Sequence, residues 1–147
     1  MFRITREVSF SYGHRLFPYE GKCARLHGHN GRLRVSLASG RLDEAGMVLD
    51  FAEVKTALAR WLDGTLDHRL ILHRDDPAVA ALRAIGEQIY AVDFNPTAEN
   101  LARHVCEHLR ALGLPVVEVE LHETDNCSAS YAPDLGAAAG GDASPVR

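Results

Sequence analysis

Cysteines are scarce in this sequence, and so are long apolar runs and clusters of positive charge. The 147 residues include three cysteines, an odd and sparse set that argues against a disulfide framework. The apolar runs fall far short of the roughly 20 residues that a membrane-spanning helix needs. The formal net charge is −4 and no run of Lys or Arg occurs, so nothing indicates a protein that binds nucleic acid.

What remains is the composition of an ordinary globular domain, with 46% hydrophobic and 24% charged residues. We expect one domain over residues 1–131, since this length suffices to bury a core. The first residues alternate apolar and polar side chains and lack the apolar stretch of a signal peptide, which favours a cytoplasmic protein with free thiols. Residues 132–147 are rich in Ala, Gly, Pro, Asp and Ser, and we expect them to form a flexible tail.

Alternating hydrophobicity predicts three β-strands. Even-numbered residues from Phe2 to His14 form one apolar face, and odd-numbered residues from His27 to Leu37 form another. A third alternating segment runs from about Val116 to Glu123, with Val117, Val119 and Leu121 on one face.

Two helices are predicted between the second and third strands. Asp50 fits an N-cap, with Glu53 completing a capping box, and Gly64 is expected to end the first helix. Thr97 fits the N-cap of a second helix that ends at Gly113. Residues 65–95 are expected to hold loops and short elements. The order strand, strand, helix, helix, strand indicates an antiparallel α+β domain.

Three histidines extend the core-facing stripes of the first two strands. Residues two apart on a strand point the same way, so His14 continues the even-numbered stripe and His27 and His29 continue the odd-numbered one. Converging neutral imidazoles suit Zn²⁺, and three protein ligands leave a fourth position for water or substrate. A single histidine such as His14 is ordinarily a packed structural residue. The shared parity, together with Gly28, which permits close backbone approach, favours a metal site.

Glu123 continues the inward face of the last strand. One interpretation is a strand-end carboxylate turned to solvent. The other is an anchor for a ligand that carries two adjacent N–H donors, which a carboxylate accepts in bidentate fashion. An unpaired carboxylate on an inward face would be costly, which gives the second interpretation its physical basis.

A cysteine and a carboxylate–imidazole pair are further candidates. Cys23 lies in a loop between Lys22 and Arg25, and nearby cations favour the reactive thiolate over the thiol. Asp67 and His68 are adjacent, so their side chains can pair only at a turn, because neighbours on a strand point apart. Either feature alone is common in proteins of many functions.

Six short motifs occur in order between residues 5 and 131: Phe10–His14, Cys23–Asn30, Gly46–Phe51, Leu66–His68, Pro96–Asn100 and His122–Thr124. The most specific is the second, a cysteine, a three-residue spacer and His-Gly-His. In this order the motifs resemble those of the 6-pyruvoyltetrahydropterin synthase and 6-carboxytetrahydropterin synthase family. Any one of them could occur by chance, whereas all six in this order are specific to the family.

The resemblance implies a tunnelling fold (T-fold), an α+β subunit in which an antiparallel four-stranded sheet carries two helices on one face. Such subunits assemble into an oligomeric barrel, typically a hexamer of two trimers, with active sites between subunits. The resemblance also implies zinc on His14, His27 and His29.

By the same resemblance, Cys23 would be the general base, and Asp67 and His68 would form a proton relay. Glu123 would anchor the pterin, and Thr97, in the fifth motif, would contact the substrate. The usual substrate of the family is 7,8-dihydroneopterin triphosphate. Neither a nucleic acid nor a membrane is expected as a partner.

The function that this implies is zinc-dependent 6-carboxy-5,6,7,8-tetrahydropterin synthesis, which feeds 7-deazapurine (queuosine) synthesis. The 6-pyruvoyltetrahydropterin synthase reaction is the alternative, with which the segment Glu123–Asn126 is compatible. Departures from the family pattern near the substrate's side chain leave both products open; they are Tyr12, Gly13, Leu70–Leu72 and a long segment at 73–92. A non-catalytic zinc module is a third possibility. A structural zinc site usually closes its fourth position with protein and does not need Cys23 or the relay pair.

Overall fold

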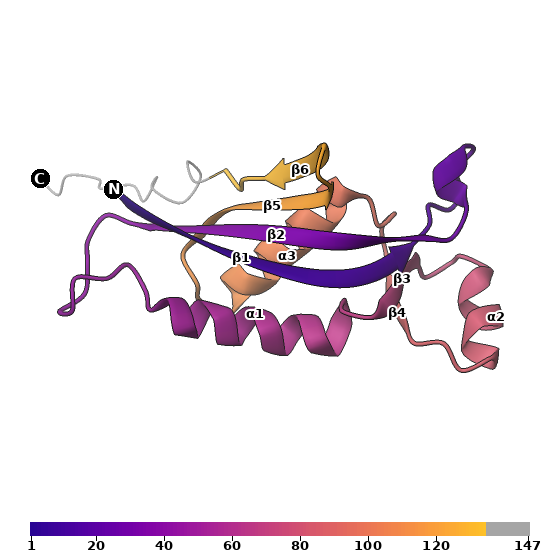
Figure 1. The fold of residues 1–147 in the computed structure, drawn as a ribbon, viewed down its shortest axis with the longest axis horizontal. Helices are drawn as coiled ribbons and strands as arrows, with labels where there is room; N and C mark the ends of the chain where they lie inside the picture. The colour runs from indigo at the N-terminus through magenta and orange to yellow at the C-terminus, as the bar shows by residue number, and fades with distance from the viewer. Residues whose placement is uncertain (135–147) are drawn as a thin grey trace, which may run out of the picture.

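Six strands form one curved sheet with helices against one of its faces (Figure 1). The computed structural model describes residues 1–134, and the order of strands across the sheet is β4-β3-β1-β2-β5-β6. The strands are β1 (Phe2–His14), β2 (His27–Ser39), β3 (Arg69–His73), β4 (Ile89–Val92), β5 (Val116–Thr124) and β6 (Cys127–Tyr131). The helices are α1 (Phe51–Thr65), α2 (Ala78–Ala84) and α3 (Ala98–Ala111), with a 3₁₀ turn at Lys22–Ala24.

The expected four-stranded antiparallel sheet is present as the part formed by β1, β2, β5 and β6. The expectation was wrong in strand and helix number, because the segment between α1 and α3 adds β3, α2 and β4. β3 pairs with β1 and with β4, and both pairings are parallel, so the sheet as a whole is mixed. Residues 65–95 therefore hold short elements, as predicted, but these elements extend the sheet.

The two longest strands form a ladder that brings the candidate histidines together. β1 and β2 pair without interruption from Phe2 opposite Ser39 to His14 opposite His27. An uninterrupted ladder preserves the alternation of faces along both strands. The histidines at the end of the hairpin consequently remain on the same face as the buried residues further along it.

Both long helices begin at the predicted N-caps. The Asp50 carboxylate accepts a hydrogen bond from the Ala52 amide at 2.7 Å, and the Thr97 hydroxyl accepts one from the Asn100 amide at 3.3 Å. Asp50 does not form the predicted capping box, because its side chain bonds Ala52 rather than the amide of Glu53. These caps satisfy amides that have no partner within the helix.

The predicted helix ends differ in accuracy. α3 ends at Ala111, and Gly113 follows it with a positive φ of 85°, as a helix-terminating glycine should. α1 continues past Gly64 to Thr65, so the prediction that Gly64 ends the helix was wrong. No helix within residues 1–134 is long and apolar enough to cross a membrane. Most of the tail predicted at residues 132–147 lies outside the described residues.

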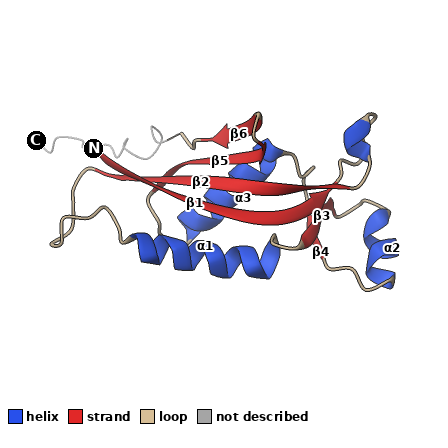
Figure 2. Ribbon diagram, in the orientation of Figure 1, coloured by secondary structure: helices blue, strands red, loops and turns tan. Residues whose placement is uncertain are grey.

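The core lies between α1, α3 and one face of the sheet (Figure 2). Its buried side chains come mainly from β2, α1, α3 and β5, and include Leu33, Val35, Leu37, Val54, Leu58, Leu62, Leu101, Val105, Leu109, Val116, Val119 and Leu121. Burial of such aliphatic side chains is the main favourable term in folding. It fixes which face of each strand points toward the helices.

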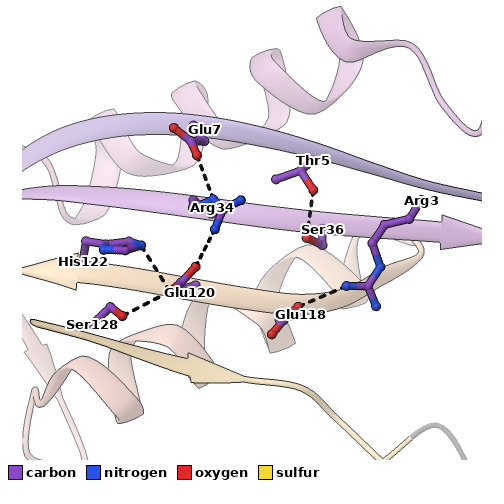
Figure 3. A network of polar contacts seen from close by, with 9 residues as sticks. All are labelled: Arg3, Thr5, Glu7, Arg34, Ser36, Glu118, Glu120, His122 and Ser128. Atoms are coloured by element: carbon purple, nitrogen blue, oxygen red, sulfur yellow. Dashed lines mark hydrogen bonds and ion pairs between the residues drawn. The ribbon is translucent and has the colours of Figure 1, made fainter.

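The opposite face of the sheet is polar (Figure 3). Arg34 bonds Glu7 at 2.7 Å and Glu120 at 3.0 Å, and Arg3 bonds Glu118 at 3.2 Å. Exposed pairs of this kind each contribute little to stability. They make this face of the sheet hydrophilic, in contrast to the face that packs against the helices.

A buried ion pair ties the long inserted segment to the end of β1. Asp76 is 3% exposed and accepts two hydrogen bonds from the Arg15 guanidinium, the one from Nε at 2.7 Å. These bonds hold the pKa of Asp76 below its usual value. Because Arg15 directly follows His14, the pair connects the segment before α2 with the strand that carries this candidate ligand.

Candidate active site

Three imidazoles converge at the end of the β1–β2 hairpin. The Nε2 atoms of His14 and His29 lie 3.1 Å apart, and the ligand atoms of His14, His27 and His29 all lie within 4.8 Å of one another. Nitrogen ligands about 2.0–2.1 Å from a tetrahedral zinc ion would stand about 3.4 Å apart. The parity prediction for these three residues is confirmed, and their spacing fits one metal ion.

Backbone carbonyls orient two of the three rings. His14 Nδ1 donates to the Pro96 carbonyl at 2.7 Å, and His27 Nδ1 donates to the Arg25 carbonyl at 2.7 Å. A carbonyl can only accept, so each ring carries its proton on Nδ1 and directs the lone pair of Nε2 toward the cluster. Burial lowers the pKa of His14, which favours the neutral form that binds metals.

Gly28 allows the hairpin to close tightly between the two ligands of β2. A Cβ atom at this position would lie 3.0 Å from the Tyr12 carbonyl oxygen. This agrees with the close backbone approach expected from the His-Gly-His motif. A larger residue would push β1 and β2 apart where the imidazoles must meet.

A cavity of about 270 Å³ opens beside the three histidines. Three of the remaining site predictions line it, namely Cys23, Thr97 and Glu123, and so does Cys127 at the start of β6. Its volume is slightly below the 300–1,000 Å³ typical of sites for small molecules. Three clustered histidines that could hold a metal ion, a thiol and a carboxylate therefore share one small cavity within a single chain.

Glu123 points inward, as its parity predicted, and a tyrosine holds it there. The Tyr12 hydroxyl donates to Glu123 Oε1 at 2.8 Å, and the same oxygen lies 3.7 Å from His14 Nε2 and 3.9 Å from His29 Nε2. Burial, and then the Glu123 charge, raise the pKa of Tyr12 far above its usual value, so the hydroxyl keeps its proton. The solvent-facing alternative for Glu123 does not describe this arrangement.

Cys23 and Thr97 reach the cavity from two different loops. Cys23 lies in the 3₁₀ turn, is exposed, and its carbonyl accepts a 2.8 Å hydrogen bond from the Leu16 amide. The Thr97 oxygen caps α3, which leaves its hydroxyl proton free to donate into the cavity. Both residues can contact a ligand bound next to the histidines.

The Asp67–His68 pair does not line this cavity. His68 adopts a left-handed backbone conformation (φ 54°), and this turn brings its Nδ1 to 3.0 Å from Asp67 Oδ1. Burial raises the Asp67 pKa, but hydrogen bonds from the Ser11 amide and from His68 outweigh it and hold the pKa below its usual value. His68 lines a second depression, of about 610 Å³, which includes His27 and His29 but not Cys23. Within one chain, the predicted base and the predicted relay therefore line different depressions, and both depressions border His27 and His29.

Tyr12, which bonds Glu123, and Cys127, which lines the cavity, were not singled out as site residues from the sequence. The sequence pattern does place Tyr12 on the same even-numbered face as His14, but on that face we interpreted it as an apolar core residue. No pattern marks Cys127, because the strand β6 that places it beside the cavity is short and exposed.

Comparison with known proteins places these residues in a family. Residues 3–134 match the profile of the family described as 6-pyruvoyl tetrahydropterin synthase. The 6-carboxy-5,6,7,8-tetrahydropterin synthase of Rickettsia conorii is 37% identical over 134 residues, which cover 86% of this chain and 97% of that protein. Its counterpart in Aquifex aeolicus is 33% identical over 156 residues, covering 87% and 96%.

Solved structures agree with this placement. An uncharacterized protein of Wolinella succinogenes superposes with a TM-score of 0.77 at 31% identity, covering 89% of this chain and 97% of that one. The 6-pyruvoyl tetrahydropterin synthase of Caenorhabditis elegans gives a TM-score of 0.68 at 28% identity, covering 90% and 95%. The T-fold expected from the sequence is confirmed.

Proposed function

The chain belongs to the 6-pyruvoyl tetrahydropterin synthase family, and we propose that it is a zinc-dependent 6-carboxy-5,6,7,8-tetrahydropterin synthase. Its substrate is 7,8-dihydroneopterin triphosphate, and its product enters 7-deazapurine (queuosine) synthesis. The observation that carries the proposal is the single cavity that contains the three convergent histidines, Cys23 and Glu123. The names of the relatives that align over most of this chain support the choice of product.

His14, His27 and His29 would hold the zinc, and their three donors leave one coordination position open. When bound, zinc supplies Lewis-acid polarisation of an oxygen on the substrate side chain, which makes the adjacent C–H more acidic. The Cys23 thiolate, on the same cavity wall, removes that proton. Glu123 accepts the paired N–H donors of the aminopyrimidine edge and so fixes the position of the ring.

The relay pair, Asp67 and His68, reaches a substrate when subunits associate. We assign Asp67 and His68 to the active site of a neighbouring subunit in a homo-oligomer, a hexamer of two trimers. The separation of His68 from the Cys23 cavity supports this, as do the small volume of that cavity and the 79% exposure of the His68 side chain. Held by Asp67, His68 then returns a proton to the substrate at a second carbon.

One experiment tests the proposed function. Purified zinc-loaded protein is incubated with 7,8-dihydroneopterin triphosphate, and the pterin product is identified by mass. The expected products are 6-carboxytetrahydropterin, acetaldehyde and triphosphate, formed with uptake of one water molecule and cleavage of one carbon–carbon bond of the side chain. A product that keeps the three-carbon side chain would assign the 6-pyruvoyl reaction instead, and the absence of turnover by zinc-loaded protein would favour a non-catalytic module.

Replacing Glu123 with Gln is expected to weaken pterin binding by roughly tenfold or more. The amide keeps the shape of the carboxylate but presents an N–H donor to the donors of the ligand. A hydrogen bond to a charged group contributes about 1.5–3 kcal/mol, and about 1.4 kcal/mol corresponds to a factor of ten. Titration calorimetry with a pterin measures the effect.

Glu120 provides the matched control for this prediction. It lies three residues earlier on β5, but its carboxylate bonds Arg34 on the polar face of the sheet. Glu120→Gln should leave pterin affinity unchanged. Equal affinities of wild-type protein and Glu123→Gln would mean that Glu123 does not anchor the ligand.

A further inference from the structure

We propose that Tyr12 is a positioning residue that holds the Glu123 carboxylate away from the metal, so that the open coordination position stays open. The inference rests on the metal centre of the proposed function and adds to it a role for a residue that lies outside the predicted site. Four observations carry it: the distance of Glu123 from the histidines, the Tyr12 hydrogen bond, the packing of the Tyr12 ring and the glycine beneath that ring.

Glu123 already lies within reach of the metal centre. Its Oε1 atom is 3.7 Å from His14 Nε2 and 3.9 Å from His29 Nε2. Two donor atoms on one tetrahedral zinc ion stand about 3.4 Å apart, so this oxygen is within about 0.5 Å of the spacing of a fourth ligand from two of the three histidines. A carboxylate at that position would complete a closed site of three histidines and one glutamate and would exclude substrate oxygen.

The Tyr12 hydroxyl competes with the metal for this same oxygen. It donates to Oε1 at 2.8 Å, and a hydrogen bond to an ionised acceptor is stronger than one between neutral groups. Tyr12 is 4% exposed, so water has little access to replace the bond. The Glu123 oxygen nearest the histidines is therefore engaged by Tyr12 rather than by a metal ion.

The tyrosine ring is itself fixed by its neighbours. It stacks on Phe10, with centroids 5.1 Å apart and an interplanar angle of 18°, and it meets the edge of the His14 ring at 5.2 Å. A ring clamped between another aromatic side chain and a metal ligand cannot follow Glu123 toward the metal. The position of the hydroxyl is thus set by packing and does not depend on its hydrogen bond.

Gly31 provides the path by which Tyr12 reaches Glu123. Tyr12 belongs to β1 and Glu123 to β5, and β2 lies between them in the sheet (Figure 1). A Cβ atom at Gly31 on β2 would lie 2.9 Å from Tyr12 Cε1 and 3.1 Å from Phe10 Cε1. The missing side chain at position 31 lets the aromatic ring cross over the middle strand. Three strands cooperate to place one hydrogen bond beside the metal.

Cobalt-substituted protein tests the proposal, because cobalt(II) absorption reports the ligands of the metal. Azide added to wild-type protein should change the spectrum by binding at the open position. In Tyr12→Phe, which keeps the ring and loses only the hydroxyl, Glu123 should occupy that position. The azide concentration at half-saturation should then rise about tenfold or more, and chelator competition should show metal bound about tenfold or more tightly, because a fourth protein ligand is added.

Three further variants make the result specific. Tyr12→Phe combined with Glu123→Gln should recover the azide response, because the amide is a poor metal ligand. Gly31→Ala keeps the hydroxyl but displaces the ring, and should shift azide binding in the same direction as Tyr12→Phe. Tyr90→Phe is the matched control, since its hydroxyl bonds His104 at 3.0 Å, away from the cavity, and it should behave as wild type.

Unchanged azide and chelator titrations in folded Tyr12→Phe would overturn this inference and leave the proposed function intact. A protein that binds neither cobalt nor zinc would overturn both. A third outcome also overturns the proposal: the spectrum changes in Tyr12→Phe, but adding Glu123→Gln does not reverse the change. Tyr12 would then act through some other residue.

Discussion

Replacing His27 or His29 with alanine is expected to reduce bound zinc from about one ion per chain to roughly a tenth of that or less. Each variant removes one of three protein donors, and changing only an outer partner of a ligand already costs about 10–100-fold in metal affinity. Both residues are only partly buried at the end of the hairpin, so their loss leaves the core intact. Elemental analysis after dialysis against a weak chelator, with circular dichroism to verify folding, gives the answer.

His104 is the control for this experiment. It is a partly buried histidine on α3 whose imidazole contacts Tyr90 and Trp61 rather than the cluster. Burial lowers its pKa, as it does for His14. His104→Ala should keep its zinc. If both His27→Ala and His29→Ala retained their full zinc content, these histidines would not be the metal ligands.

Strand parity predicted the histidine cluster because the β1–β2 ladder has no irregularity between Phe2 and His14. The same reasoning was less accurate for β5, where the register against β2 shifts between Ser36 and Leu37. Val117 was predicted on the buried face, yet Val116 is the buried residue of the two. Beyond the shift, Val119, Leu121 and Glu123 follow the predicted face. The bulge leaves Val117 of β5 without a partner on β2, and the alternation of side chains along one strand does not reveal where its pairing skips a residue.

The parallel strands β3 and β4 could not be predicted from local pattern. They comprise five and four residues, which is too short for a reliable period. Their place depends on pairing with the edge of β1 and on the Arg15–Asp76 ion pair, which are both contacts between distant parts of the chain.

Contacts across three strands are equally hidden from the sequence. Tyr12 and Glu123 are 111 residues apart and meet only because Gly31 lets a ring pass over β2. The motifs therefore identified the groups that carry the chemistry, whereas the residue that positions one of them emerged from packing. The separation of Cys23 from His68 is likewise a property of the folded chain.

Replacing Cys23 with alanine is expected to lower the turnover number by about 10²–10⁴-fold, the usual contribution of a general base. The cysteine is exposed in a 3₁₀ turn and packs against nothing in the core, so the fold should be unaffected. Zinc should also be retained, because Cys23 is not among the three clustered ligands. Steady-state assays of zinc-loaded wild-type and variant proteins measure the effect.

Cys127 is a matched control for Cys23, because both thiols are exposed and line the same cavity. If only Cys23 acts as the base, Cys127→Ala should keep most of its activity. Iodoacetamide should inactivate both wild type and Cys127→Ala, because it reacts with Cys23, which lies between Lys22 and Arg25. The comparison separates a thiol that removes a proton from one that merely borders the substrate. If Cys23→Ala turned over at nearly the wild-type rate, the base would have to be another group, and His68 of a neighbouring subunit would be the next residue to replace.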